Sequence, residues 1–307
     1  MNPEEWWKNF ALGLELDASG TFVYNGIRLL HEAANLHHAA DVFEILYNIS
    51  VGIERLLKVA IVLVEHDPEA DILSLEKSLV THSSIALADR LAARRSLRLA
   101  SIHREFLSLL SQFYSVHRYH RFSFSSIRDI DEERRLFVAF VCKHLQIAHP
   151  KRDDLIPFQN TDVIRKFVGK VVRGICVQAF RVVRERAAEM HIYTYELRID
   201  SKAMRVFHGQ RLDLIDEDLK RRELLLFLMN PSSGGPHIEL LRSFSPLALD
   251  DGLAPAYVRA LLNERDVHSV GDEVDELYSE VDKPAERHEF LRIMDDEFLL
   301  YDDDEAD

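Results

Sequence analysis

Apolar residues recur at three- and four-residue intervals through most of this chain, and this periodicity constrains its fold more than any other feature. Glycine and proline are scarce before residue 230. The spacing predicts helices over about Ile27–Glu65, from near Ile72, over Ser84–Leu97 with continuation to His117, after Asp131, and over Val163–Met190. We therefore expect a mostly α-helical protein.

One segment has the alternating pattern of a β-strand instead. His191–Ile199 (HIYTYELRI) is rich in β-branched and aromatic residues, which predicts a short strand. The turn-forming residues of Asn230–Pro236 (NPSSGGP) predict a linker. We expect a helical domain over residues 1–208 with this short β element, and a smaller acidic C-terminal region over residues 209–307.

Charge is unevenly distributed along the chain. The segment Arg90–Arg186 holds 20 Lys and Arg against 9 Asp and Glu, a net charge of +11, although the whole chain has a net charge of −14. From Gly209 onward there are 10 basic against 26 acidic residues, a net charge of −16. A basic region can attract phosphates. Pairing of its arginines with acidic groups, in this chain or in a partner, is the alternative.

The stretch FYSVHRYHRFSF, Phe113–Phe124, interleaves basic residues with aromatic rings. Guanidinium groups bind phosphate through paired hydrogen bonds, and an aromatic ring can stack on a base. The nucleic-acid-binding residues predicted on this ground are His117, Arg118, Tyr119 and Arg121. The alternative is structural, because the same aromatic rings can anchor a helix end to the core.

Four segments together resemble the HEPN superfamily, over roughly residues 25–190. They are YNISVGIERLLK (Tyr47–Lys58), EKSLVTH (Glu76–His82), FYSVHRYHRFSF and YTYELR (Tyr193–Arg198). The resemblance implies an all-α bundle that often dimerises. Many members are metal-independent ribonucleases of toxin–antitoxin, CRISPR or phage-defence systems, whose site is an Arg followed after four to six residues by a His.

The catalytic candidates implied by this chemistry are Arg118, His120, Arg121, Arg98 and His103. A His can move the 2′-OH proton of RNA, and an Arg can stabilise charge on the scissile phosphate. Arg98 and His103 have the family spacing, but Leu99 stands where a polar residue is usual. We expect an endoribonuclease of a prokaryotic defence or toxin–antitoxin system. The alternative is a catalytically inactive HEPN-like interaction subunit that binds an acidic partner or a nucleotide.

The sequence has no phosphate-binding glycine loop, dinucleotide fingerprint, zinc-protease motif or nucleophile elbow. We therefore expect no cofactor and no metal site. The expected partners are RNA or nucleotide phosphate, a second protein, and a second copy of this chain. The N-terminal residues lack the features of a signal peptide, and no apolar run approaches membrane-spanning length, so we expect a cytoplasmic protein without a membrane association.

Overall fold

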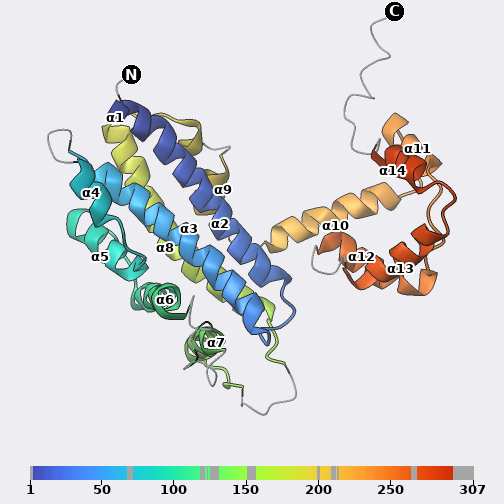
Figure 1. Ribbon diagram of the computed structural model, residues 1–307, viewed down its shortest axis with the longest axis horizontal. Helices are drawn as coiled ribbons and strands as arrows, with labels where there is room; N and C mark the ends of the chain where they lie inside the picture. The colour runs from blue at the N-terminus through green and yellow to red at the C-terminus, as the bar shows by residue number, and fades with distance from the viewer. Residues whose placement is uncertain are drawn as a thin grey trace, which may run out of the picture. The chain divides into compact units, whose positions relative to one another are not determined.

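The computed structural model describes residues 3–67, 72–117, 122, 124, 131–150, 157–198, 201–208, 212, 214–263 and 268–292. Contacts divide the chain into two compact units, Met1–Leu214 and Ile215–Asp307, a few residues beyond the boundary expected after His208. The described residues form helices and connecting loops, and their only β-type pairing is an isolated bridge between Asn35 and Gln159. The prediction of a mostly α-helical protein is confirmed (Figure 1).

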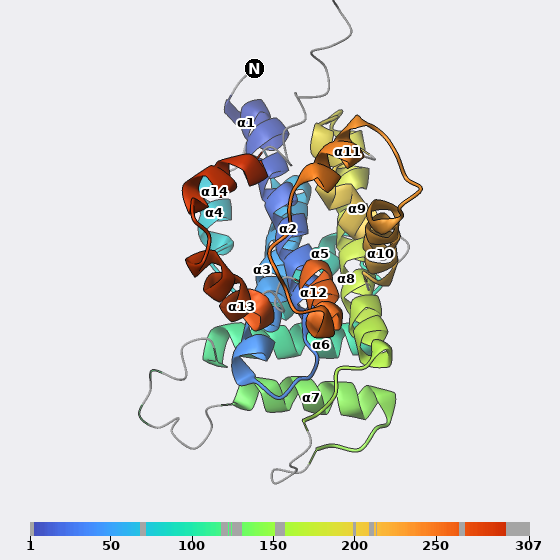
Figure 2. The ribbon, with the colours of Figure 1, turned by 90° about the vertical axis from the view of Figure 1, so that its right-hand side faces the viewer.

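Unit 1 is a bundle built around one central helix. Its elements are α1 (Pro3–Trp6), η1 (Trp7–Ala11), α2 (Leu12–Glu32), α3 (Ala39–Glu65), α4 (Ile72–Ser78), α5 (Ser84–Arg94), α6 (Ser101–Gln112), η2 (Phe113–His117), α7 (Glu132–Leu145), α8 (Asp162–Glu189), η5 (Tyr195–Leu197) and α9 (Lys202–His208). Helix α3 contacts α2, α5, α7 and α8. Figure 1 shows α2, α3 and α8 side by side, and Figure 2 shows α6 and α7 running across them.

Small residues let α2 and α3 approach closely. A Cβ atom on Gly52 of α3 would lie 2.6 Å from Cγ2 of Val23 and 2.8 Å from its backbone nitrogen. The buried Ser19 hydroxyl donates a hydrogen bond of 2.7 Å to the carbonyl oxygen of Gly52. Because α3 is covered on several sides, side chains around most of its circumference are buried, which explains its nearly continuous apolar sequence.

The expected single helix over Ile27–Glu65 is wrong, because the chain reverses direction between α2 and α3. The loop is held by the segment before α8: Leu36 N–H donates to Phe158 O at 2.9 Å, and Asn160 N–H donates to Ala34 O at 3.2 Å. The Asn160 amide also donates to Leu30 O at 2.5 Å and to Ala33 O at 2.8 Å. These bonds satisfy carbonyls at the end of α2, so the helix can end without proline or glycine.

The expected continuous helix from Ser84 to His117 is also divided. Helix α5 ends at Arg94, and α6 begins at Ser101. In the connection, Arg98 N–H donates to the Gln178 side-chain oxygen at 3.3 Å, and Ala100 N–H donates to His103 Nδ1 at 3.2 Å. Both acceptors are side-chain atoms. The spacing of apolar residues therefore could not predict the break between α5 and α6.

The expected strand over His191–Ile199 is wrong in its described part, 191–198. This segment forms a 3₁₀ turn over Tyr195–Leu197. Ile192 N–H donates to Ala187 O at 2.8 Å, which closes the end of α8. Ile192 is buried while Tyr193 and Tyr195 are exposed, so the alternation of the sequence reflects burial along an irregular segment. A strand needs a neighbouring strand for its hydrogen bonds, and none lies among the described residues.

The predicted helix Val163–Met190 is confirmed to within one residue at each end, and the predicted helix start after Asp131 is also confirmed. Helix α8 spans Asp162–Glu189, and α7 begins directly after Asp131. Asp131 does not cap α7 through its side chain, since its carboxylate pairs with Arg134 at 2.5 Å and with Arg135 at 3.4 Å. The negative charge of Asp131 still lies at the N-terminus of α7, which is the positive end of the helix dipole.

Unit 2 consists of short helices: α10 (Ile215–Met229), α11 (Pro236–Ser243), η6 (Asp251–Leu253), α12 (Ala254–Leu262), α13 (His268–Ser279) and α14 (Pro284–Arg292). Of the linker predicted over Asn230–Pro236, residues 230–235 connect α10 with α11, and Pro236 is the first residue of α11. Glu273 of α13 accepts hydrogen bonds from the Tyr257 hydroxyl at 2.7 and 2.8 Å and from Asp250 N–H at 2.9 Å. Desolvation, reinforced by this carboxylate, raises the pKa of Tyr257 to about 12.

Candidate functional site

Most of the predicted phosphate-binding residues lie outside the described part of the chain. Arg118, Tyr119, His120 and Arg121 belong to this group, and His117 is the last residue of η2. The segment begins in the core, because Phe113 is buried, whereas the rings of Phe122 and Phe124 are exposed. The expectation that Arg118 and Arg121 bind phosphate therefore stays a prediction.

His103 has a packing role in the structure. Its Nδ1 accepts the Ala100 N–H, and its ring lies so close to Gly174 of α8 that a Cβ atom there would lie 2.7 Å from Cε1. Burial lowers the pKa of His103 below its usual value. The Arg98 side chain is exposed, and its backbone N–H is bound to Gln178. A catalytic role for these two residues stays a prediction.

A buried carboxylate on α3 collects two basic side chains. Glu54 is 7% exposed, and its Oε1 lies 2.6 Å from Lys58 Nζ. His82, in the loop between α4 and α5, places Nδ1 3.2 Å from both Oε1 and Oε2 of Glu54. The His82 side chain is 54% exposed, so the carboxylate holds a ring that solvent can reach.

Aromatic contacts connect this group with the start of FYSVHRYHRFSF. The rings of His82 and Tyr114 lie 4.6 Å apart, and Tyr114 stacks on Tyr47 of α3 at 6.4 Å. Phe43 continues the row, with its ring 6.3 Å from Tyr47 and 5.2 Å from Phe113. The start of the basic and aromatic segment, at Phe113 and Tyr114, therefore lies beside the Glu54–His82 pair.

This arrangement suits general acid–base chemistry. When the Nδ1 of a neutral imidazole donates to a carboxylate, the other ring nitrogen is left as a proton acceptor. The buried carboxylate also fixes the ring in one orientation. In the sequence, Glu54, Lys58 and His82 stand out only as members of the segments that carry the family resemblance. The contact between Glu54 and His82 joins helix α3 to the loop before α5, 28 residues further along the chain, so no local sequence pattern indicates it.

A second group has the same composition but a different environment. Glu105 Oε2 lies 3.1 Å from His144 Nε2, and Lys143 Nζ lies 2.7 Å from Glu105 Oε1. The His144 ring packs against Phe140 at 4.7 Å and Phe167 at 6.1 Å, and its side chain is 20% exposed. The Lys143 ammonium lowers the pKa of Glu105. Because the His144 ring is packed between other side chains, we assign this group a structural role. His144 therefore serves as the matched control for His82.

Many cations of the basic segment are paired within unit 1. Arg90 binds Glu65 through two hydrogen bonds of 3.0 and 2.6 Å, and Arg95 binds Glu189 through two of 3.2 and 2.8 Å. Arg186 donates to Leu63 O at 3.0 Å. Intrachain pairing therefore accounts for part of the +11 charge, as the alternative interpretation of that charge expected.

Among the described residues, no three His, Cys, Asp or Glu side chains are arranged to hold a metal ion. None of the described helices combines the length and apolar character needed to cross a bilayer. Both cysteines, Cys142 and Cys176, are buried free thiols, and burial raises the pKa of each. No family model, no curated protein and no solved structure matches this chain.

Proposed function

We propose that this chain is a HEPN-like protein of a prokaryotic defence or toxin–antitoxin system and that it is a metal-independent endoribonuclease. The observation that carries the proposal is the position of His82, which is held by the buried Glu54 carboxylate and open to solvent. The aromatic row of Tyr114 and Tyr47 beside it can support a splayed base. The family resemblance supports the choice of RNA as substrate.

The reaction is transesterification by the 2′-hydroxyl. His82 takes the 2′-OH proton, the 2′ oxygen attacks the adjacent phosphorus, and the bond from phosphorus to the 5′ oxygen breaks. The departing 5′ oxygen takes a proton from solvent or from the imidazolium. The products are a 2′,3′-cyclic phosphate and a 5′-hydroxyl, and no metal or oxidant is consumed. In this proposal, Arg118 and Arg121 stabilise the charge that develops on the phosphate.

The test is cleavage of a fluorescent RNA by the full chain in excess EDTA. His82→Ala should lower the cleavage rate by about 10²–10⁴-fold, the usual contribution of general acid–base catalysis. Glu54→Gln should lower it less, because the imidazole remains but loses its carboxylate. His144→Ala is the matched control and should leave the rate unchanged. Absence of cleavage by the unmodified chain, or equal rates for His82→Ala and His144→Ala, would refute the proposal.

The second candidate is an interaction subunit without catalytic activity. It is favoured by the apolar run Leu224–Met229 of α10, in which five of six residues are exposed: Leu224 62%, Leu226 64%, Phe227 53%, Leu228 47% and Met229 70%. Such a run is an expected contact for a protein partner or a second copy of the chain. Light scattering decides whether the chain is a homodimer, because a mass of 35.5 kDa at micromolar concentration would identify a monomer.

A further inference from the structure

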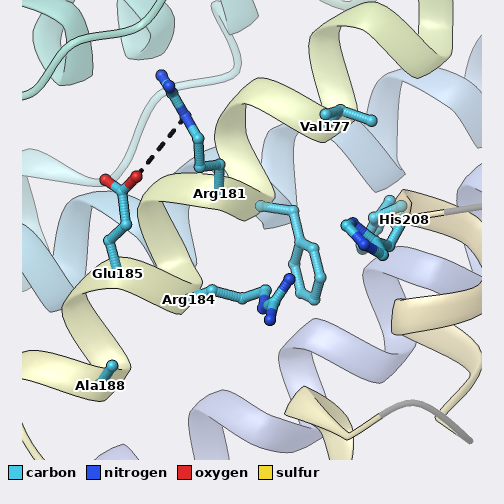
Figure 3. Close-up of a pocket in the computed structure, with 8 residues that line it drawn as sticks. Val177, Arg181, Arg184, Glu185, Ala188 and His208 are labelled. Carbon is cyan, nitrogen blue, oxygen red and sulfur yellow. Dashed lines mark ion pairs between the residues drawn. The ribbon is translucent and has the colours of Figure 1, made fainter.

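A hollow of about 390 Å³ lies between α8 and α9 of unit 1, away from the Glu54–His82 pair (Figure 3). Its apolar lining comes from Val177, Phe180 and Ala188 of α8 and from Phe207 of α9. Phe180 and Phe207 are buried, with ring centroids 5.4 Å apart. Volumes of about 300–1,000 Å³ and mainly apolar walls are typical of small-molecule sites.

The rim of the hollow is charged, with an excess of positive groups. The Arg181 guanidinium already has partners within the chain: it donates to Ser96 O at 2.7 Å, and its Nε lies 3.9 Å from Glu185 Oε1. Arg184 is exposed and makes no hydrogen bond or ion pair with any described residue. Figure 3 shows Arg184 extending toward the side where His208 lies, while Arg181 and Glu185 point the other way, toward each other.

We propose that this hollow binds a small organic anion with an apolar body, of the class of medium-chain aliphatic carboxylates. The apolar walls take the alkyl chain, and Arg184 takes the carboxylate, which suits the two-pronged geometry of a guanidinium group. His208 adds a second donor at the same rim. The site is independent of the proposed ribonuclease activity, since it shares no residue with the Glu54–His82 pair.

The walls favour a carboxylate with an alkyl chain over a nucleotide. A nucleobase has hydrogen-bonding groups around its edge, and the walls of Val177, Phe180, Ala188 and Phe207 side chains leave those groups without partners. An alkyl carboxylate has all its polar atoms at one end. Its requirements match this hollow, where the polar groups of the described lining residues lie at the rim.

Calorimetric titration of the full chain with hexanoate, octanoate and decanoate, below their micelle concentrations, tests the proposal. We expect one saturable site whose Kd falls about fourfold for each added methylene group, until the hollow is filled. Octanol should bind through the same walls, but more weakly than octanoate. Binding that is weak and unsaturable for every chain length, or tighter binding of adenosine monophosphate than of octanoate, would overturn the proposal.

Variants separate the two parts of the site. Arg184→Gln should weaken octanoate binding about tenfold and leave octanol binding unchanged. Lys170→Gln, an exposed change on α8 outside the hollow, is the control and should alter neither. Ala188→Trp should fill the hollow and abolish both, with circular dichroism confirming the fold. If Arg184→Gln and Lys170→Gln weaken octanoate equally, the anion is held by diffuse charge and the proposed site is wrong.

Discussion

The imidazole of His103 occupies the space that a side chain at position 174 would need, so His103 and Gly174 fix the contact between α6 and α8. A Cβ atom on Gly174 would lie 2.7 Å from Cε1 of His103 and 3.2 Å from Cδ2. Glycine inside a helix costs roughly 0.5–1 kcal/mol relative to alanine. Here the close approach of a ring explains why the glycine is needed.

We expect Gly174→Ala to destabilise unit 1, with the overpacking cost of about 1–3 kcal/mol exceeding the gain in helix propensity. His103→Ala with Gly174→Ala should recover part of that loss, because the clash is removed. Both tryptophans, Trp6 and Trp7, lie in unit 1, so tryptophan fluorescence during urea unfolding measures the change. If the two substitutions simply add, the ring does not determine the requirement for glycine.

Stability should also depend on the protonation of His103. Burial lowers the pKa of His103 in the folded protein below its unfolded value of about 6.5, so the unfolded chain binds the proton more readily. The free energy of unfolding should therefore decrease as the pH falls through 6.5. His103→Gln, which cannot be protonated, should show a smaller decrease between pH 7.5 and pH 5.5. Equal slopes for the two proteins would contradict this assignment.

Replacing two helical glycines with alanine should change the stability of the protein in opposite directions. At Gly52 the new methyl group would meet the backbone nitrogen of Val23 at 2.8 Å, so α2 and α3 would have to separate, at a cost of about 1–3 kcal/mol. At Gly271 of α13 nothing lies within 4 Å, and Gly271→Ala should stabilise unit 2 by roughly 0.5–1 kcal/mol. Scanning calorimetry measures both. A stabilised Gly52→Ala protein would refute the close packing of α2 on α3.

Arg90 should contribute more to the free energy of unfolding of unit 1 at neutral pH than at acidic pH. Its guanidinium binds both oxygens of Glu65 and also Ser78, and the hydrogen bonds to Glu65 lower the pKa of that carboxyl. The stabilisation is present above the unfolded pKa of about 4.3 and is lost as the pH falls through the lower folded value.

Arg90→Ala should therefore cost about 1–2 kcal/mol at pH 7, as expected for a partly buried charged hydrogen bond, and clearly less at pH 3. Arg94→Ala on the same helix is the control. Arg94 is exposed and affects Glu65 only through its charge, so its removal should cost less than about 0.5 kcal/mol at either pH. Urea unfolding at the two pH values measures the difference. A cost for Arg90→Ala that does not change with pH would exclude the ion pair as its source.

The helices of this protein, and several of their ends, could be predicted from sequence because their causes are local. The apolar stripe of α8 recurs at helical spacing over its whole length, and Asp131 places a charge directly before α7. Such signals come from residues within one or two turns of one another, where helical geometry determines which side chains share a face.

Where the helices end, and which side chains meet, depended on contacts between distant segments. Asn160 lies 127 residues from Ala33, yet its amide closes the end of α2. The HIYTYELRI segment has a strand pattern but finds no neighbouring strand among the described residues, and its backbone turns locally instead. The pairing of Glu54 with His82 follows from the packing of α3 against the start of α5. Local sequence determined that this chain is helical, while tertiary packing decided its reversals and its candidate site, because those hydrogen bonds have donors and acceptors far apart in the chain.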